Sequence, residues 1–545
     1  MLKKLREYLS ENNLDYLIIN TTDEFLVEYN ELSNCSRYFV TGFSGSTGDV
    51  LLSKKTLWQF VDGRYHEQAD NEVDLKTTTV VKLQLGQTYL NELVKRINPD
   101  SNIGVVSNKI SLNFYKALNA KLIDKNCKII SLETDPVSLF ALIKPSEKQQ
   151  IAENIDTEIA GISADDKFFK LAKRLKTNES YLDTNLENIA YLTNCRQYKT
   201  PFASTFKAKM LIKKDKAYIY TNERFQSVIG KYFEILPLND FANSILNTES
   251  VYFNPTTINL YDYNLIEKKA KESKKDFIKL MKSIKTESEI KHFKSAYERT
   301  DIVVNTINNV LQNKVYTESE LSDLTEKEFL KQGAKQLSFK TILAAGKNSS
   351  VIHYSHPSEK TEINDGDFVL LDCGGHFEGG YSTDITRTFV KGQPDKEQKK
   401  VYTTVLKMFL NAYNYNVTQR TTGFTLDRIA RQIHKKSGLK EFNFNHGLGH
   451  GVGINVHENP PSISCSQSGK TVLKPNMVFT IEPGLYKAGF GGVRLENSVY
   501  LLKENGKLKI ESLSHVPFQE NAIDYELLNE HETIWLKDWQ EKCKK

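Results

Sequence analysis

A glycine-rich stretch with three histidines restricts what the last third of this chain can form. The stretch HGLGHGVGINVHE, residues 446–458, has four glycines within seven residues. Each glycine costs about 1 kcal/mol in a helix interior, which argues against a helical His-Glu-x-x-His metal motif. A dinucleotide-binding loop needs glycine at its first, third and sixth positions, but the sixth residue from either possible start is Val452 or Ile454. The stretch is therefore predicted to be a loop or an irregular strand edge.

Length and composition are typical of a soluble protein with several domains. With 545 residues the chain is too long for a single core, and three domains are expected. No uninterrupted apolar run reaches the roughly 18 to 20 residues that a membrane span needs, so no membrane partner is expected. The net charge of +5 is small and its lysines are scattered, so nucleic-acid binding is not indicated either.

The N-terminus and the cysteines indicate a cytoplasmic protein. MLKKLREYLSENN predicts a charged amphipathic helix without the apolar core of a signal peptide, so export is not expected. The six cysteines lie far apart without a C-x-x-C pair, which argues against a disulfide framework and against a zinc ribbon. We expect reduced and mostly buried thiols.

The order of predicted elements in the first part of the chain repeats once. A helix and an apolar strand at residues 16–20 are followed by two strands around a Lys-Lys turn in GDVLLSKKTLWQFVDGRY. The second third has a helix near DKFFKLAKRLKT and again two strands around a charged turn in AKMLIKKDKAYIYTNERF. This repetition predicts two related αβ domains, although unrelated αβ segments can share such an order.

Two domain boundaries are predicted. One lies near Lys144-Pro145-Ser146. The other lies at Thr286, which forms with Glu289 a capping box that opens a helix with periodic apolar positions. The fold class is thus mixed α/β (α+β), with two αβ domains before a third domain that ends in a helical extension. The predicted domains are residues 1–145, 146–285 and 286–545.

Two segments of the last third predict β-hairpins that each carry a pair of acids. In DFVLLDCGGHFEGGYSTDITRTF the turn is expected around Glu378, six residues from both Asp372 and Asp384. In MVFTIEPGLYKAGFGGVRLENSVYL, two glutamates, Glu482 and Glu496, are each seven residues from a central glycine. With turns centred there, the two acids of each pair lie opposite each other on one face.

Four converging carboxylates need a positive partner. At ~4 Å each pair repels by about 1 to 4 kcal/mol. Four carboxylates and one imidazole, without a thiolate, suit two hard or borderline divalent ions. Alternatively, Arg387 and Arg494 supply ordinary salt-bridge partners. Residue spacing alone does not show that the two hairpins and the histidine stretch meet.

These motifs, in their order along the chain, resemble a known family. HY, TDITR, HGLGHGVG, NVHE, EPG and VRLEN are similar to the pita-bread metallopeptidases of family M24, specifically to the Xaa-Pro aminopeptidases of the three-domain cytosolic type. TGFSGSTG and VDGRYHEQA resemble the first domain of these enzymes, and IAYLTNCR resembles the second. The resemblance implies two creatinase-like αβ domains followed by a catalytic pita-bread domain.

The resemblance also implies roles for individual residues. His353 and His457 would hold the substrate and stabilise the oxyanion, while Glu482 would act as the base. His446 and Arg494 would lie in the substrate pocket. The five metal ligands would be Asp372, Asp384, His450, Glu482 and Glu496.

Some positions depart from the family pattern or match nothing in it. Asp372 and Asp384 are one residue further apart than usual, which predicts an enlarged turn or a bulge. His356 and His376 match no functional position and are expected at the surface.

The activity that the resemblance implies is release of the N-terminal residue from peptides with proline in the second position. Two divalent ions, with Mn²⁺ expected and Co²⁺, Fe²⁺ or Zn²⁺ as alternatives, would activate a bridging hydroxide that attacks the scissile carbonyl. A prolidase with nearly the same ligands and a non-catalytic peptide-binding or protein-binding member of the fold are the alternative hypotheses. A homodimer is the expected assembly.

Overall fold

The computed structural model describes residues 1–84, 86–141 and 150–544. Its contacts divide the chain into two compact units, and the predicted boundary near residues 144–146 lies outside the described residues. None of the helices in the described ranges is both long enough and apolar enough to cross a membrane. The first unit comprises Met1–Asn154, Ser163–Pro201 and Thr205–Ile278, and the second comprises Ile155–Ile162, Phe202–Ser204 and Lys279–Lys545.

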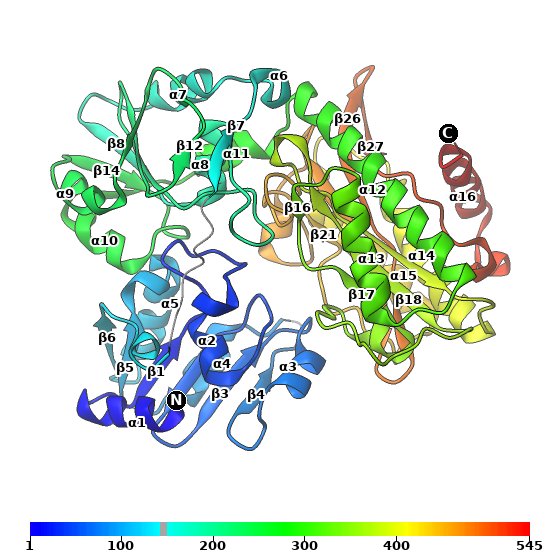
Figure 1. Cartoon of the computed structure of the whole chain (residues 1–545), viewed down its shortest axis with the longest axis horizontal. Coiled ribbons are helices and arrows are strands. Elements are labelled where there is room, and N and C mark those ends of the chain that lie inside the picture. The colour runs from blue at the N-terminus through cyan, green and yellow to red at the C-terminus, as the bar shows by residue number, and fades with distance from the viewer. Residues whose placement is uncertain (85, 142–149, 545) are drawn as a thin grey trace. The chain divides into compact units, whose positions relative to one another are not determined.

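The first unit contains two six-stranded sheets with matching strand orders, β4-β3-β2-β1-β5-β6 and β13-β11-β10-β8-β14-β15 (Figure 1). In each sheet three successive strands, β1-β2-β3 or β8-β10-β11, pair antiparallel. The remaining strands are added to this centre by parallel pairing. The shared order and directions confirm the prediction of two related αβ domains. The strands are β1 (Tyr16–Ile19), β2 (Val50–Ser53), β3 (Leu57–Val61), β4 (Thr79–Lys82), β5 (Asn102–Val106), β6 (Lys128–Leu132), β8 (Glu179–Asp183), β10 (Lys209–Ile212), β11 (Ala217–Tyr220), β13 (Phe233–Leu236), β14 (Ser250–Phe253) and β15 (Ala270–Glu272).

Helices flank these sheets where the sequence supplies an apolar face and a cap. The predicted N-terminal helix forms as α1 (Leu2–Glu11), whose Leu5 and Leu9 are buried one turn apart. Side-chain caps open other helices, such as Ser111 before α5 (Leu112–Ile123). The remaining longer helices are α3 (His66–Glu72), α4 (Tyr89–Arg96), α7 (Ala164–Ala172), α8 (Leu186–Thr193) and α10 (Leu260–Ile266), and most of α11 (Phe277–Ser283) belongs to the second unit.

In the second unit, the long helix α12 (Glu287–Asn313) opens the continuous segment that carries the candidate site. Thr286 and Glu289 form the predicted capping box at its start. Helices α12 and α13 (Glu318–Lys331) share a hydrophobic core with strand residues such as Leu371 and Ile385. A separate core joins other strands to α14 (Lys396–Tyr413), α15 (Gly423–Ser437) and α16 (Glu530–Lys542).

Short antiparallel ladders lie between these helices and carry the candidate site. Three strands form the order β17-β18-β20, and another three form β23-β26-β27. Two-stranded pairs β16–β19, β21–β22 and β24–β25 complete the set. The strands are β16 (Gln336–Leu337), β17 (Ile342–Ala345), β18 (Phe368–Cys373), β19 (Gly375–His376), β20 (Ile385–Val390), β21 (Gly449–His450), β22 (Ser462–Ile463), β23 (Val478–Ile481), β24 (Gly484–Lys487), β25 (Gly491–Arg494), β26 (Asn497–Glu504) and β27 (Lys507–Ser512).

Candidate metal centre

The first predicted hairpin forms, but its register differs from the prediction. Strand β18 pairs with β20 so that Asp372 faces Thr386, and the same register continues to a bridge between His376 and Ser382. The turn is therefore centred on Gly379 rather than on Glu378. Asp372 and Asp384 lie two residues out of register, and the prediction that they lie directly opposite each other is wrong. Residues two apart on a strand share a face, so both acids still lie on the same side.

The extra residue between these two acids is accommodated in the turn. Residues Glu378–Gly380 form the turn, in which Gly379 and Gly380 have left-handed φ values of 77° and 71°. Glycine adopts this left-handed backbone without steric cost. The ladder from Phe368 to Cys373 keeps one register throughout, so the enlarged turn is correct and the alternative of a bulge is not.

The second hairpin forms as predicted around Gly489. Ladder β24–β25 pairs Gly484 with Arg494, and ladder β23–β26 pairs Ile481 with Asn497. Both ladders have the same register, and it places Glu482 opposite Glu496 at the junction between them. The two glutamates are thus fixed by paired strands on both sides.

The two hairpins meet directly. The Glu496 amide donates a hydrogen bond to the Thr386 carbonyl oxygen (3.0 Å), and the Ser498 hydroxyl donates one to the Asp384 carbonyl oxygen (3.1 Å). The Thr386 hydroxyl donates a further bond to Glu496 Oε2 (2.7 Å). Acids from separate segments therefore face one site.

The histidine stretch supplies an imidazole to this site. His450 Nε2 lies 3.4 Å from Asp384 Oδ2 and 3.6 Å from Glu482 Oε1. One potential ligand atom from each of Asp384, His450 and Glu496 lies within 4.8 Å of the other two. The stretch is a loop with a two-residue strand, as predicted. A side chain at Gly449 would place its Cβ 2.1 Å from the Thr480 carbonyl oxygen, so glycine is needed for this close approach to β23.

Asp372 is linked to the other acids by Arg494, which donates hydrogen bonds both to Asp372 and to Thr386. Arg494 Nη2 donates to Asp372 Oδ2 (2.5 Å), and Arg494 Nε donates to the Thr386 hydroxyl (3.1 Å). The other oxygen, Asp372 Oδ1, is buried and has no hydrogen-bond partner among the described residues. Arg494 thus pairs with the Asp372 carboxylate, whereas the hydrogen bonds described for Arg387 go to carbonyl and amide oxygens and not to the carboxylates of the cluster.

The electrostatics of the cluster indicate missing positive charge. Burial, and then the carboxylates of Glu496, Asp372 and Glu482, raise the pKa of Asp384 well above its ordinary value. Burial and the nearby Glu482 and Asp372 carboxylates likewise raise the pKa of Glu496. A buried carboxylate oxygen without a donor, beside acids that repel one another, fits hard divalent cations as the missing partners.

The other predicted histidines lie at different distances from this cluster. The rings of His457 and His450 are in edge contact, with centroids 4.5 Å apart. His446 Nδ1 lies 3.8 Å from Glu482 Oε2. His353 is half-buried, and the carbonyl oxygen of its neighbour Ile352 accepts a hydrogen bond from Arg494 Nη1 (3.3 Å).

Two histidines were predicted to be surface residues, and the structure shows one of them exposed and the other buried. His356 is exposed, as predicted. His376 is fully buried, so that prediction is wrong. It lies in β19, which pairs with β16, and its Nδ1 is 3.3 Å from both the Gly380 carbonyl oxygen and the Ser382 hydroxyl. Tertiary pairing at this end of the hairpin buries the ring.

Residues that the sequence reasoning missed connect the predicted ones. The Tyr486 hydroxyl accepts from Arg494 Nη1 (2.8 Å) and lies 2.9 Å from His446 Nε2. The Tyr297 hydroxyl accepts from the Asp384 amide (3.0 Å). Thr386 stands beside Asp384 in the TDITR motif, which could have drawn attention to it. Tyr297 lies 87 positions away from Asp384, and nothing in the local sequence indicates their contact.

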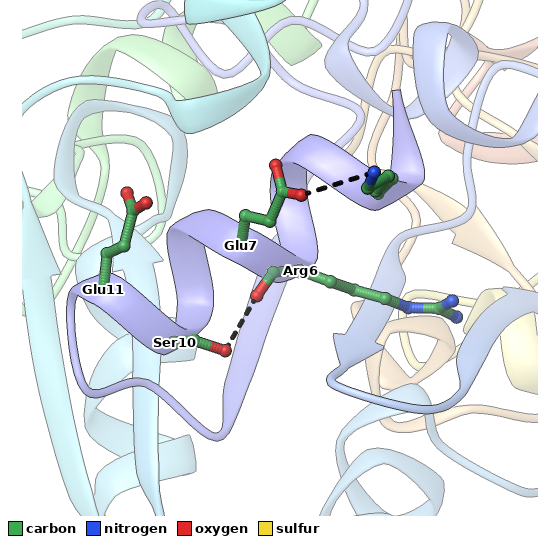
Figure 2. Close-up of a pocket in the computed structure, with 5 residues that line it drawn as sticks. Arg6, Glu7, Ser10 and Glu11 are labelled. Atoms are coloured by element: carbon green, nitrogen blue, oxygen red, sulfur yellow. Dashed lines mark hydrogen bonds and ion pairs between the residues drawn. The ribbon is translucent and has the colours of Figure 1, made fainter.

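A surface hollow in the first unit has none of these properties. It lies along α1, where Arg6, Glu7, Ser10 and Glu11 project from one helix (Figure 2). Its ion pair between Lys3 and Glu7 spans 3.9 Å and is largely exposed, and such pairs contribute about 0 to 1 kcal/mol. The hollow is an ordinary charged helix surface.

A site of acids and one histidine on paired hairpins, preceded by two related αβ domains, defines a metallopeptidase of the pita-bread fold. Residues 291–503 match the Metallopeptidase family M24, and residues 1–137 and 143–289 each match a Creatinase/Prolidase N-terminal domain. Residues 291–503 therefore form a domain of metallopeptidase family M24.

The chain is also similar to one curated protein and two solved structures, which it matches over different shares of its length. A protein of Laccaria bicolor named "Probable Xaa-Pro aminopeptidase P" is 28% identical, over 99% of this chain and 88% of the relative. The crystal structure of X-prolyl aminopeptidase from Caenorhabditis elegans, described as a cytosolic enzyme with a di-nuclear active site, is 25% identical. It superposes with a TM-score of 0.93 over 99% of this chain and 94% of that one. The prolidase of Pyrococcus horikoshii is 28% identical with a TM-score of 0.53, over 65% of this chain and 98% of that one.

Proposed function

We propose that this protein is a metal-dependent aminopeptidase that removes the N-terminal residue from peptides with proline in the second position. The observation that carries this function is the convergence of four carboxylates and His450 from three separate segments at one buried site. Relatives named Xaa-Pro aminopeptidase that match nearly the whole chain support the specificity. The prolidase, which matches only part of the chain, makes the dipeptidase alternative less favourable.

The proposed ligands are five residues of this site. The matching relative with a di-nuclear active site supports two divalent ions, and Mn²⁺ remains our expectation for their identity. When bound, these ions would polarise the scissile carbonyl and lower the pKa of a water molecule. The ligands are Asp372, Asp384, His450, Glu482 and Glu496.

One of the ligands, Glu482, and the side chains around the ligands would then perform the remaining steps. Glu482, placed between His450 and His446, accepts the proton of the attacking water and returns it to the leaving nitrogen. His457, in ring contact with His450, donates a hydrogen bond to the developing oxyanion, and His353 holds the substrate backbone. Arg494 fixes Asp372 and, through the Tyr486 hydroxyl, the His446 ring.

Three further properties belong to this proposal. The domain limits 1–145, 146–285 and 286–545 agree broadly with the ranges matched by the three family models. A cytoplasmic location is supported by the cytosolic relative and by six free cysteines. Homodimerisation is expected from the resemblance.

A paired peptidase assay tests the function. The purified protein, freed of metal and reloaded with Mn²⁺, should cleave an Xaa-Pro tripeptide and leave the corresponding Xaa-Pro dipeptide largely intact. Asp384→Ala should lower turnover by several orders of magnitude, because a ligand beside His450 is lost. Asp538→Ala, at an exposed position of α16, is the matched control and should retain wild-type turnover.

The outcomes separate the alternatives. Preference for the dipeptide would indicate a prolidase, and absence of cleavage of either peptide would indicate a binding protein. Full activity of Asp384→Ala would refute the ligand assignment.

A further inference from the structure

The segment that carries His353 is anchored by an acid on a distant helix. Residues 346–358 leave β17, make one 3-10 turn at Gly346–Ser350 and continue without a strand ladder past His353. An irregular segment of this kind needs side-chain contacts to hold one position, because it lacks the repeated backbone bonds of a sheet. The contacts converge on Glu318, the first residue of α13.

Glu318 is fully buried and accepts four hydrogen bonds from this segment and its border. Oε1 accepts from the Ala345 amide (2.7 Å) and from the Asn348 side chain (3.0 Å). Oε2 accepts from the Tyr354 hydroxyl (2.7 Å) and from the Ser358 amide (2.9 Å). One oxygen thus holds the start of the segment and the other holds its end, with His353 between them.

The middle of the segment is bound to the candidate metal centre. Arg494, which binds Asp372, also donates to the Ile352 carbonyl oxygen, one residue before His353 (3.3 Å). The Gly492 amide in the same strand as Arg494 donates to the Ser349 hydroxyl (2.8 Å). Glu318 and the hairpin of Arg494 therefore fix the backbone before and after His353 from two sides.

All four donors to Glu318 are uncharged. A buried carboxylate without a cationic partner is stabilised only while each oxygen accepts its hydrogen bonds, so the segment has to keep the geometry that supplies them. An uncharged amide cannot replace it, because in either orientation its NH₂ group would face a backbone N–H that needs an acceptor, that of Ala345 or that of Ser358.

We propose that Glu318 is a positioning residue that places His353 for contact with the substrate. This inference depends on the proposed function, in which His353 holds the peptide. It concerns a residue that touches no predicted ligand in the described structure and that lies 35 positions before His353 in the chain.

A double-mutant cycle tests the inference. We would compare kcat/KM for an Xaa-Pro tripeptide among wild type, Glu318→Gln, His353→Ala and the double variant, each loaded with Mn²⁺. Glu318→Gln should lower kcat/KM about 10- to 100-fold, because misplacement of a positioned group by about 1 Å has effects of this size. In the His353→Ala background the same substitution should have an effect of less than about threefold, since its target is gone.

The matched control is Glu320→Gln on the same helical turn. Glu320, the third residue of α13, accepts from the Thr317 amide in the capping box, and glutamine serves equally well at that position. This variant should retain wild-type kcat/KM. Metal content should be unchanged in every variant, because no predicted ligand is altered.

Each outcome decides one part of the argument. Equal effects of Glu318→Gln with and without His353 would overturn the positioning role, since a purely structural loss lowers activity in both backgrounds. An inactive wild type would refute the proposed function instead, and a fully active His353→Ala variant would refute the substrate-holding role of His353 and, with it, the positioning role of Glu318. Where Glu318→Gln does not fold, Tyr354→Phe removes a single donor and should show the same dependence on His353 at smaller size.

Discussion

Buried carboxylates occur at two places in the second unit, and they differ in whether nearby lysines neutralise them. At the candidate metal centre, burial and neighbouring carboxylates raise the pKa of Asp384 and of Glu496. At Glu458, the last residue of the histidine stretch 446–458, burial alone would raise the pKa of the carboxyl, but Lys282 and Lys285 lower it below its ordinary value. The carboxylates of the candidate metal centre repel one another, whereas the Glu458 carboxylate is neutralised by two lysines of the same unit.

The contacts of Glu458 show how complete its compensation is. Its side chain is about as buried as those of the two lysines, and Oε1 accepts from Lys285 Nζ while Oε2 lies 3.5 Å from Lys282 Nζ. The Ile454 amide donates to Oε2 as well (3.0 Å). These bonds link the segment before α12 to the loop of residues 451–458, at whose end His457 lies.

The difference shows which charges the fold itself satisfies. Removing Glu458 would leave two buried lysines without their acid, so this group is needed for folding. Removing an acid of the metal centre would relieve repulsion in the absence of ions, so that group is maintained at some cost in stability. A cluster of this kind is expected at a functional site rather than in a structural core.

The largest change in stability is expected when Glu458 loses its charge beside Lys282 and Lys285. Glu458→Gln should lower the free energy of unfolding by about 3 to 5 kcal/mol, because it leaves two buried ammonium groups with an uncharged partner. Urea denaturation followed by circular dichroism measures this. Combining Glu458→Gln with Lys285→Met restores the wild-type charge of the group and should recover part of the loss.

An exposed ion pair provides the control for this substitution. Glu441 lies 3.1 Å from Lys487 and its side chain is 60% exposed. Glu441→Gln should change the free energy of unfolding by less than about 1 kcal/mol. If Glu458→Gln is equally mild, Glu458 is not an essential counter-charge and the comparison fails.

At the candidate metal centre, a substitution is expected to raise the stability of the metal-free protein, by a smaller amount than the loss at Glu458. The raised pKa of Asp384 means that its stabilising contribution is complete below the ordinary aspartate value and is lost as pH rises through the folded-state value. Metal-free Asp384→Asn should therefore be more stable than the metal-free wild type at pH 8, by about 1 to 3 kcal/mol, with the gap closing toward pH 4. The lowered pKa of Glu458 gives the reverse dependence, with stability lost in acid.

Addition of Mn²⁺ should close or reverse this difference in stability between the wild type and Asp384→Asn at pH 8. At a hundredfold excess over its dissociation constant, a bound ion stabilises by about 2.7 kcal/mol, and this gain should be absent in Asp384→Asn. Glu458→Gln should keep the gain despite its lower starting stability. A wild type that is insensitive both to pH and to Mn²⁺ would contradict the presence of a cation site.

Symmetric spacing made much of this site predictable. Glu482 and Glu496 are equidistant from Gly489, and the structure pairs them in that register. The same reasoning misplaced Asp384 relative to Asp372 by two positions, because residues 378–380 offered two glycines and the turn is centred on the first of them. Alternation kept both acids on one face, so the error left the predicted cluster intact.

Residues whose roles depend on distant partners were not predictable. His376 follows a strand and reads as a loop residue, but its burial depends on pairing with Gln336, 40 positions earlier. Glu318 reads as an ordinary acid in the first turn of a capped helix, and its four donors lie 27 to 40 positions further along the chain. Local patterns identify candidate ligands, whereas the groups that hold these side chains in place come from tertiary contacts.

The smallest effect is expected at a hydroxyl between the acids and Arg494. Thr386 Oγ accepts from Arg494 Nε and donates to Glu496 Oε2, while Thr388, on the same strand, bonds only the Arg494 backbone in the described contacts. Both threonines are fully buried, so Thr386→Val and Thr388→Val should lose similar stability. Only Thr386→Val should weaken Mn²⁺ binding, by about 10- to 100-fold, because it frees the orientation of a ligand carboxylate. Competition with a chelating dye measures this affinity. Equal Mn²⁺ affinities in the two variants would show that Glu496 is held by the strands alone, and the metal centre would then depend on backbone register rather than on its hydrogen-bonded neighbours.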